Sequence, residues 1–284
     1  MKLSNRQVER FESDGVIHVP GAVDKGWIDE LLGMSEKAMS THGDWINDGN
    51  PGAQANRMFT RRYMWKDNSV IARFLKEGPC GAIAGQAMGS SSARFYFDHL
   101  LIKEPMTVAQ TPWHQDIPYW PFMGTQVCSV WVALTDATVQ ESAMEFVRGS
   151  HRDGKYYKPE LFNDRRSHPN SWALEAKGEP VPDIEADREA FEIIGFDVAA
   201  GDAIVFSAWI LHGAPGNASQ NRRRVALSTR WLGNNAVWQP KPGADPIVGE
   251  NDVSILAGNY PADDDNFPVF WSSDRTLRNC RFGE

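Results

Sequence analysis

Residues 113–122, WHQDIPYWPF, contain a histidine and an aspartate two positions apart. In an extended strand successive side chains point to opposite faces, so His114 and Asp116 are expected to point the same way. An imidazole and a carboxylate that converge on one point supply two of the three ligands of a 2-His-1-carboxylate iron site. The pair alone is a weak signal, because a surface histidine beside a turn aspartate gives the same pattern.

A third candidate ligand strengthens this interpretation. His212 ends the apolar, strand-like run AIVFSAWILH at 203–212, directly before the Gly/Pro/Asn turn at 213–217. Such a pattern indicates a buried strand followed by a loop. A histidine at that boundary is well placed to join His114 and Asp116.

An arginine-bearing strand follows twelve residues after His212. The run RVALSTRWL at 224–232 is rich in β-formers, and its alternation puts Arg224, Ser228 and Arg230 on one face. A buried arginine is costly without an anion to pair with. A dicarboxylate ligand would supply that anion.

Five blocks of sequence together resemble the phytanoyl-CoA dioxygenase family of Fe(II)/2-oxoglutarate-dependent oxygenases. HQDIPYWPF at 114–122, LHGAPGN at 211–217 and RVALS at 224–228 carry the resemblance. The opening at 3–31 is similar to the family's helix–strand–helix entry, and AMEFVRGSHRDG at 143–154 is similar to its strand and Gly-Ser-His turn. The blocks occur in the family's order.

The expected fold is mainly β with flanking helices. Many short strands after an initial helical part, without alternating βαβ units, are typical of a jelly-roll barrel. The resemblance implies the same architecture, a double-stranded β-helix (cupin-like) barrel with helices outside. Helices are expected over 5–13, 25–40 and 68–85, the last of them interrupted near Gly78 and Pro79. Strands are expected over 16–20, 93–103, 126–137, 143–147, 192–198, 203–211 and 224–232.

One domain is expected over 1–284, because barrel domains of this size are common. It comprises a helical part over about 1–92, a jelly-roll core over about 93–232 and a wrapping tail over about 233–284. The core contains a charged insertion over about 151–190, expected to form a variable wall of the substrate pocket. The polar residues 41–60 are expected to form a loop that serves as a lid or rim of the pocket.

The resemblance also assigns site residues. His114, Asp116 and His212 would bind Fe(II), and Arg224 would bind the distal carboxylate of 2-oxoglutarate. The loop after His212 is one residue longer than the family's pattern, so Arg222, Arg223 and Arg230 remain alternatives to Arg224. Further positions match residues that contact the cosubstrate, or could replace a hydrogen bond that Ala214 cannot make, and these are Trp131, Gln115, Leu100 and Ser228.

The implied reaction uses O2 and 2-oxoglutarate to hydroxylate, or otherwise oxidise, a C–H bond of a small organic molecule, with release of succinate and CO2. Two alternatives stay open: a cupin-like hydrolase or isomerase that does not use 2-oxoglutarate, and a non-catalytic small-molecule binding protein. Apolar walls of the substrate pocket are expected from aromatic residues close to the motifs, namely Trp113, Tyr119, Trp120, Trp65 and Trp209.

The amino-acid composition limits the classes of partner that the protein is expected to bind. With 29 basic and 37 acidic residues the net charge is −8, which argues against general binding to nucleic acid or to an anionic membrane. The three cysteines, Cys80, Cys128 and Cys280, lie far apart without a zinc spacing. Together with the lack of an apolar signal region, this favours a cytoplasmic protein. The expected partner is a small-molecule substrate, and the pattern predicts no oligomeric state.

Overall fold

The computed structural model describes residues 1–159 and 175–274, and two antiparallel sheets dominate it. The larger, eight-stranded sheet has the order β1-β10-β7-β12-β4-β3-β2, with β14 also pairing with β4. Its strands are β1 (Val16–Val19), β2 (Ile46–Gly49), β3 (Met58–Arg62), β4 (Ser92–Lys103), β7 (Val127–Ala133), β10 (Ala203–Ser207), β12 (Arg224–Leu232) and β14 (Val269–Ser272).

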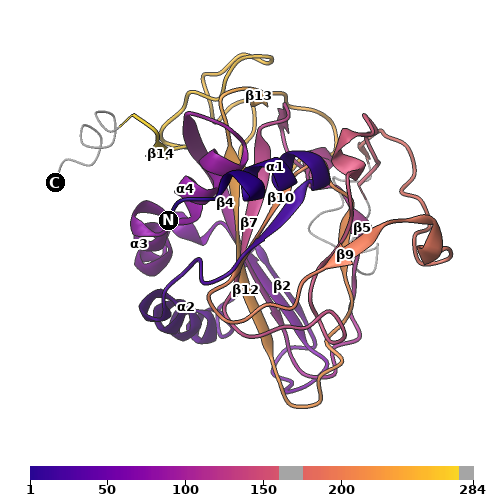
Figure 1. Cartoon of the computed structure of the whole chain (residues 1–284). Helices are drawn as coiled ribbons and strands as arrows, with labels where there is room; N and C mark the ends of the chain where they lie inside the picture. The colour runs from indigo at the N-terminus through magenta and orange to yellow at the C-terminus, as the bar shows by residue number, and fades with distance from the viewer. Residues whose placement is uncertain (160–174, 275–284) are drawn as a thin grey trace.

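The smaller sheet has four strands in the order β5-β11-β8-β9. These are β5 (Thr111–His114), β8 (Glu145–Val147), β9 (Ile193–Gly195) and β11 (His212–Ala214). A further pair joins β6 (Phe122–Met123) to β13 (Val237–Trp238). Two facing antiparallel sheets confirm the predicted jelly-roll fold, and in Figure 1 the larger sheet lies between the helices and the smaller sheet.

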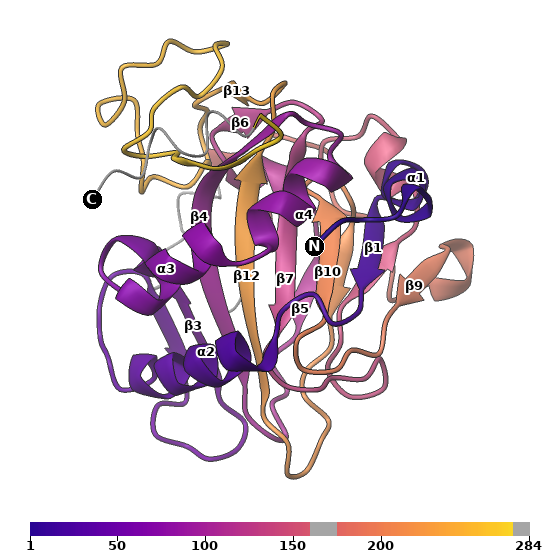
Figure 2. The same ribbon diagram turned by 60° about the vertical axis from the view of Figure 1, so that its left-hand side comes forward.

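Four α-helices cover the outer face of the larger sheet, as Figure 2 shows. They are α1 (Asn5–Asp14), α2 (Lys25–Ala38), α3 (Ser69–Glu77) and α4 (Cys80–Ala87). Ser4 caps α1 in a capping box, and Asp24 caps α2 through the backbone N–H of Trp27. The helical segment over 68–85 is interrupted at the expected place, because Gly78 ends α3 and Pro79 precedes α4.

Alternation along β12 divides a hydrophobic core from a cavity. On β12, Val225, Leu227 and Trp231 belong to the core under the helices. Arg224 and Ser228 project from the opposite face, toward the smaller sheet. The one strand therefore supplies both the packing that anchors the helices and the polar groups of the cavity.

The segment 41–60, expected to be a loop, is partly a hairpin. β2 and β3 pair along their length and extend the larger sheet beyond β4. Asn47 and Thr60 from this hairpin line the cavity, which agrees with the expected rim. Its Asn/Gly-rich composition concealed the strands, since packing against β4 overrides weak local propensity.

The described part of the tail after β12 lies over one end of the barrel. Trp238 and Phe267 are almost completely buried there, against Phe122 and Tyr96. Cys80 and Cys128 are buried free thiols, whereas Cys280 lies outside the described residues. In the described part of the chain, no helix combines the length and the apolar character needed to cross a membrane.

Candidate active site

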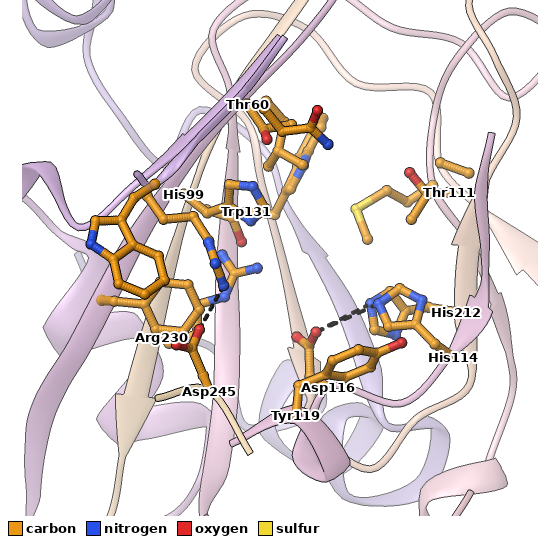
Figure 3. A pocket seen from close by; sticks show the side chains of 18 of the residues that line it. Thr60, His99, Thr111, His114, Asp116, Tyr119, Trp131, His212, Arg230 and Asp245 are labelled. Carbon is orange, nitrogen blue, oxygen red and sulfur yellow. Dashed lines mark hydrogen bonds and ion pairs between the residues drawn. The ribbon is translucent and has the colours of Figure 1, made fainter. Parts of the chain in front are cut away.

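Three side chains converge where the two sheets face one another. β5 and β11 are antiparallel neighbours that place His114 opposite His212. Nε2 of His114 lies 3.6 Å from Oδ1 of Asp116, and Nε2 of His212 lies 3.9 Å from the same oxygen. One potential ligand atom from each residue lies within 4.8 Å of the others, and Figure 3 shows the three side chains turned toward one another.

Asp116 reaches this point by a route that strand alternation does not describe. β5 ends at His114, and Asp116 has helical backbone angles (φ −76°, ψ −38°) as it precedes the 3-10 turn η2 (Ile117–Tyr119). The convergence predicted for His114 and Asp116 is thus present. It depends on a turn that bends the carboxylate back toward the imidazoles.

Backbone carbonyls fix the orientation of both imidazoles. Nδ1 of His114 lies 2.8 Å from the carbonyl oxygen of Pro112, and Nδ1 of His212 lies 3.0 Å from that of Ile210. A carbonyl oxygen can only accept, so each Nδ1 carries the proton and each Nε2 presents a lone pair. Ser129 Oγ donates to Asp116 Oδ2 at 2.8 Å. Such supporting contacts are typical of metal ligands.

The protonation states also suit a cation. Burial, reinforced by His114, lowers the pKa of His212 to about 3. Burial raises the pKa of Asp116, but the adjacent imidazoles of His114 and His212 and the charge of Arg230 outweigh it and hold the pKa well below its usual range. At neutral pH His212 is therefore neutral and Asp116 ionised, as metal binding requires. Two nitrogens and one carboxylate without a thiolate fit Fe(II).

A cavity of about 1170 Å³, its open mouth included, extends from these three residues between the sheets. Its walls combine aromatic rings with charged groups. The lining residues that concern the site are Asp44, Trp45, Thr60, Arg62, Phe97, His99, Leu101, Tyr119, Trp120, Trp131, Arg224, Ser228, Arg230 and Asp245.

Arg224 is the arginine that faces the cavity at the start of β12. Its side chain is buried, its Nε has no hydrogen-bond partner in the described chain, and its guanidinium lies 5.8 Å from the ring of Trp131. Burial lowers its pKa to about 10, so it remains a cation at neutral pH. Arg222 and Arg223 instead form ion pairs, with Glu141 and with Glu104 and Glu36.

Arg230, the remaining alternative, also faces the cavity, at the other end of β12. Its guanidinium lies over the rings of Phe97 and Trp120, 4.9 and 5.9 Å from their centroids. Both its Nε and its Nη1 are buried without a hydrogen-bond partner. The cavity thus contains two buried guanidinium groups in different positions.

Four further predicted residues line the cavity: Trp131, Ser228, Tyr119 and Trp120. Trp131 lies beside Ser228 in the sheet register, and the buried Ser228 Oγ has no partner in the described structure. The ring of Tyr119 stands edge-on to His114, with centroids 5.8 Å apart. These positions agree with roles in binding a cosubstrate or a substrate.

Leu100 and Gln115, expected to contact the cosubstrate, lie elsewhere. Leu100 belongs to the core under the helices, and its neighbours His99 and Leu101 face the cavity instead, because adjacent strand residues take opposite faces. Gln115 donates to the carbonyl oxygens of Lys155 and Trp209 and accepts from the N–H of Tyr157. Its amide holds loops together and does not line the cavity.

Three of the expected apolar walls are also absent from the cavity lining. Trp113 alternates away from His114 and donates its indole N–H to Glu185. Trp65 packs against Phe95 and Phe270 under the helices. Trp209 donates its indole N–H to the carbonyl oxygen of Gly124. Proximity to a motif in sequence did not indicate the face on which each ring lies.

The insertion over 151–190 falls partly outside the described residues, since 160–174 are not described. None of its described residues lines the cavity. Tyr157 bridges to Glu179, and Glu185 receives the indole N–H of Trp113. The predicted role as a pocket wall therefore has no support from the described part.

The site residues that the sequence interpretation missed include His99, Ser129 and Asp245. Ser129 lies two positions before Trp131 on β7, so alternation could have revealed it, whereas the assignment of Leu100 to the cavity put its neighbour His99 on the opposite face. Asp245 carried no such signal, because it reaches the cavity from the irregular tail. Its carboxylate accepts from Arg62 at 2.6 Å, and both residues line the cavity.

A sequence profile of the phytanoyl-CoA dioxygenase (PhyH) family matches residues 11–225. The chain belongs to this family. The profile spans every strand that contributes to the three-residue cluster, and it ends just inside β12. The resemblance drawn from the sequence is confirmed.

Two characterised relatives are similar to this family member in sequence. L-proline trans-4-hydroxylase of Streptomyces griseoviridis is 30% identical over 169 residues, which cover 57% of this chain and 63% of the hydroxylase. That alignment therefore spans less than two thirds of the hydroxylase. Methylphosphonate hydroxylase of Gimesia maris is 23% identical over 231 residues, with 80% of each chain covered.

Solved structures share the fold across nearly the whole chain. The non-heme alpha-ketoglutarate-dependent carbocyclase SnoK from nogalamycin biosynthesis superposes with a TM-score of 0.71 at 20% identity, covering 94% of this chain and 96% of SnoK. The epimerase SnoN, crystallised with Fe3+, alpha-ketoglutarate and nogalamycin RO, gives 0.69 at 23% identity, covering 94% and 98%. Family and neighbours support an iron- and 2-oxoglutarate-dependent oxygenase.

Proposed function

We propose that this protein is an Fe(II)- and 2-oxoglutarate-dependent dioxygenase that hydroxylates a C–H bond of a small organic molecule. The observation that carries the proposal is the combination of two features in one cavity. His114, Asp116 and His212 form a three-residue N/O cluster, and the buried guanidinium of Arg224 faces the same space without an anion. A metal site alone or an arginine alone would fit many binding proteins.

Each residue has a distinct task in this proposal. His114, Asp116 and His212 hold the iron, and Ser129 keeps the Asp116 carboxylate in place. Arg224 binds the distal carboxylate of 2-oxoglutarate, and the free Ser228 Oγ adds a hydrogen bond to the same group. Trp131 forms the wall beneath Arg224. These contacts orient the cosubstrate and exclude water from it.

Bound iron and 2-oxoglutarate supply the oxidising chemistry, in which O2 is consumed and 2-oxoglutarate is converted to succinate and CO2. Around that centre the protein orients the substrate and excludes water. Tyr119 and Trp120 follow the Asp116 ligand directly and form an apolar boundary of the cavity. They would hold a substrate C–H near the metal and shield it from bulk water.

The test is turnover by protein loaded with Fe(II) under anaerobic conditions. On addition of oxygen and 2-oxoglutarate we expect succinate, and we expect its rate to rise with a correct substrate and a product 16 mass units heavier. Amino acids and small phosphonates are the first compounds to screen, since the relatives are named for L-proline and methylphosphonate. A protein that neither binds 2-oxoglutarate nor forms succinate would contradict the proposal.

The same site could instead catalyse a cyclisation or an epimerisation. Structural neighbours include a carbocyclase and an epimerase. Succinate formed with a product of unchanged or reduced mass would assign such a reaction in place of hydroxylation. A cupin-like hydrolase or isomerase, or a pure binding protein, is disfavoured, because neither requires Arg224 to face the metal cluster without an anion.

A further inference from the structure

The four buried arginines of the described chain fall into two classes. Arg57 and Arg94 lie away from the cavity, and each pairs with a carboxylate: Arg57 with Asp48 at 2.7 Å and Arg94 with Asp264 at 2.6 Å. Arg224 and Arg230 both face the cavity, and neither has an ion pair or hydrogen bond in the described structure. Burying a guanidinium is expensive unless an anion compensates it. The cavity therefore contains two buried guanidinium groups that each lack a counter-anion.

The proposed cosubstrate, 2-oxoglutarate, would supply the counter-anion for Arg224. Arg230 would still lack a counter-anion. This residue is only 7% exposed, and its Nε and Nη1 are both buried without partners. The aromatic rings of Phe97 and Trp120 lie against the guanidinium. Rings on which a guanidinium stacks limit its movement and leave its in-plane N–H groups available to a planar acceptor.

Among the described residues, no carboxylate takes up these N–H groups. Asp116 belongs to the metal cluster, and its Oδ2 accepts from Ser129. Asp245 also lines the cavity, but its carboxylate accepts from Arg62 and from the backbone N–H of Ile247. Asp98, on the far side of β4, accepts from the backbone N–H groups of Met64 and Trp65.

The remaining polar neighbours do not change this balance. His99 lies on the cavity face of β4 with a buried Nε2 that has no partner, and burial, assisted by the charges of Arg230 and Arg62, holds its pKa well below the usual range. Asp44 is an exposed residue of the lining, and solvent screens its charge. An oxyanion bound at Arg230 would thus meet the guanidinium groups of Arg230 and Arg62, a neutral imidazole and apolar rings. The nearby carboxylates of Asp116 and Asp245 are each engaged by another partner.

We propose that Arg230 is the recognition residue for a carboxylate on the primary substrate, so that the substrate is a small organic acid whose apolar body lies along Phe97, Trp120 and Tyr119. This inference rests on the proposed function, because it assigns the other end of the cavity to 2-oxoglutarate. A planar carboxylate matches the fork of N–H donors that a guanidinium presents. Arg230 would determine which molecules enter near the metal, and Arg224 which cosubstrate is used.

The experiment uses full-length protein loaded with Fe(II) and saturated with 2-oxoglutarate under anaerobic conditions. Binding is measured by calorimetry for three acid–amide pairs: phenylacetate and phenylacetamide, hexanoate and hexanamide, L-proline and L-prolinamide. We expect at least one acid to bind tenfold or more tightly than its amide. Arg230→Gln should weaken the binding of that acid by about two orders of magnitude and remove the preference for acid over amide. Arg230→Lys should recover part of the lost affinity.

Two controls separate recognition from structure. Arg222→Gln removes an exposed arginine of the same segment and should leave acid binding unchanged. In ligand-free protein, Arg230→Gln should be at least as stable to heat as the wild type, since it removes a buried charge that has no partner. A large fall in melting temperature for Arg230→Gln would show that Arg230 is structural, and this would overturn the proposal.

The affinity for 2-oxoglutarate decides between the two sources of a carboxylate. We expect Arg230→Gln to change it less than threefold and Arg224→Gln to weaken it strongly. If Arg230→Gln weakens 2-oxoglutarate as much as Arg224→Gln does, Arg230 serves the cosubstrate and the proposal is overturned, while the oxygenase assignment survives. Equal binding of every acid and its amide by the wild type would also overturn it. Failure of the wild type to bind any 2-oxoglutarate would contradict the proposed function itself. In that case the preference for acids and its dependence on Arg230 would still be measurable in protein loaded with metal alone.

Discussion

The guanidinium of Arg224 lies 5.8 Å from the ring of Trp131, on strands that are direct neighbours in the larger sheet. This contact gives a buried cation one favourable interaction but no counter-charge. A cation–π contact is worth about 2 kcal/mol at most when desolvated, whereas stranding one charge of a buried pair costs about 3–5 kcal/mol. The arginine is therefore prepared for an anion, and its removal has a measurable consequence.

Arg224→Ala should raise the concentration of 2-oxoglutarate needed for half-maximal binding by about two to three orders of magnitude, since each 1.4 kcal/mol is about tenfold. Arg224→Lys should recover only part, because an ammonium lacks the bidentate fork. Anaerobic titration of the iron-loaded protein measures both. Arg222→Ala, which loses only an exposed ion pair, is the matched control. Unchanged 2-oxoglutarate binding in Arg224→Ala would refute the assignment.

Each residue of the metal cluster should be required separately. His114→Ala, Asp116→Ala and His212→Ala should each reduce the Fe(II) content after anaerobic loading to a small fraction of one per chain, because two remaining ligands hold iron poorly. Far-ultraviolet circular dichroism should remain that of the folded barrel. His18→Ala, which alters a histidine paired with Asp202 outside the cavity, should load iron normally. Normal iron content in any cluster variant would remove that residue from the ligand set.

Ser129 offers a subtler test of the same site. Its Oγ donates to Asp116 Oδ2, so Ser129→Ala leaves the three ligands in place but frees one carboxylate oxygen. Loss of such a supporting contact typically weakens metal affinity by about 10- to 100-fold. Competition with a chelator of known affinity measures the change. An affinity equal to that of the wild type would mean that the turn at Asp116 alone orients the carboxylate.

How far the sequence predicted this site depended on the kind of signal. Motif and spacing predicted the cluster residues, and strand alternation put Arg224 on the cavity face, although Asp116 reaches the cluster through a turn. Arg222 and Arg223 could be separated from Arg224 only when the structure showed their acidic partners. Residues such as Trp65 and Trp209 failed because aromatic character does not reveal which face of an element is buried. Asp245 could not be predicted, since its position depends on the path of an irregular tail.

Lys241, in that tail, predicts a pH-dependent stability. Its ammonium is largely buried and donates to the carbonyl oxygens of Ile117 and Phe122, and burial lowers its pKa to about 8. A lysine with a lowered pKa in the folded state destabilises the fold at pH values below about 8, and this penalty disappears as the pH rises toward the unfolded value near 10.5.

The stability of the wild type relative to Lys241→Met should therefore increase by up to about 3 kcal/mol between pH 7 and pH 10.5. Urea unfolding of both proteins across this range measures the difference and cancels the titration of all other groups. Lys25→Met, at an exposed position paired with Asp29, is the control and should show almost no such change. A constant difference for Lys241→Met would show that its ammonium is solvated in the folded protein.

The ion pair between Arg62 and Asp245 joins positions 183 residues apart and completes the cavity wall opposite the metal cluster. The ligands of that cluster belong to β5, β11 and the turn between β5 and β7, none of which includes either partner. A substitution in the hairpin or in the tail would therefore change the shape of the cavity without touching any strand that carries a metal ligand.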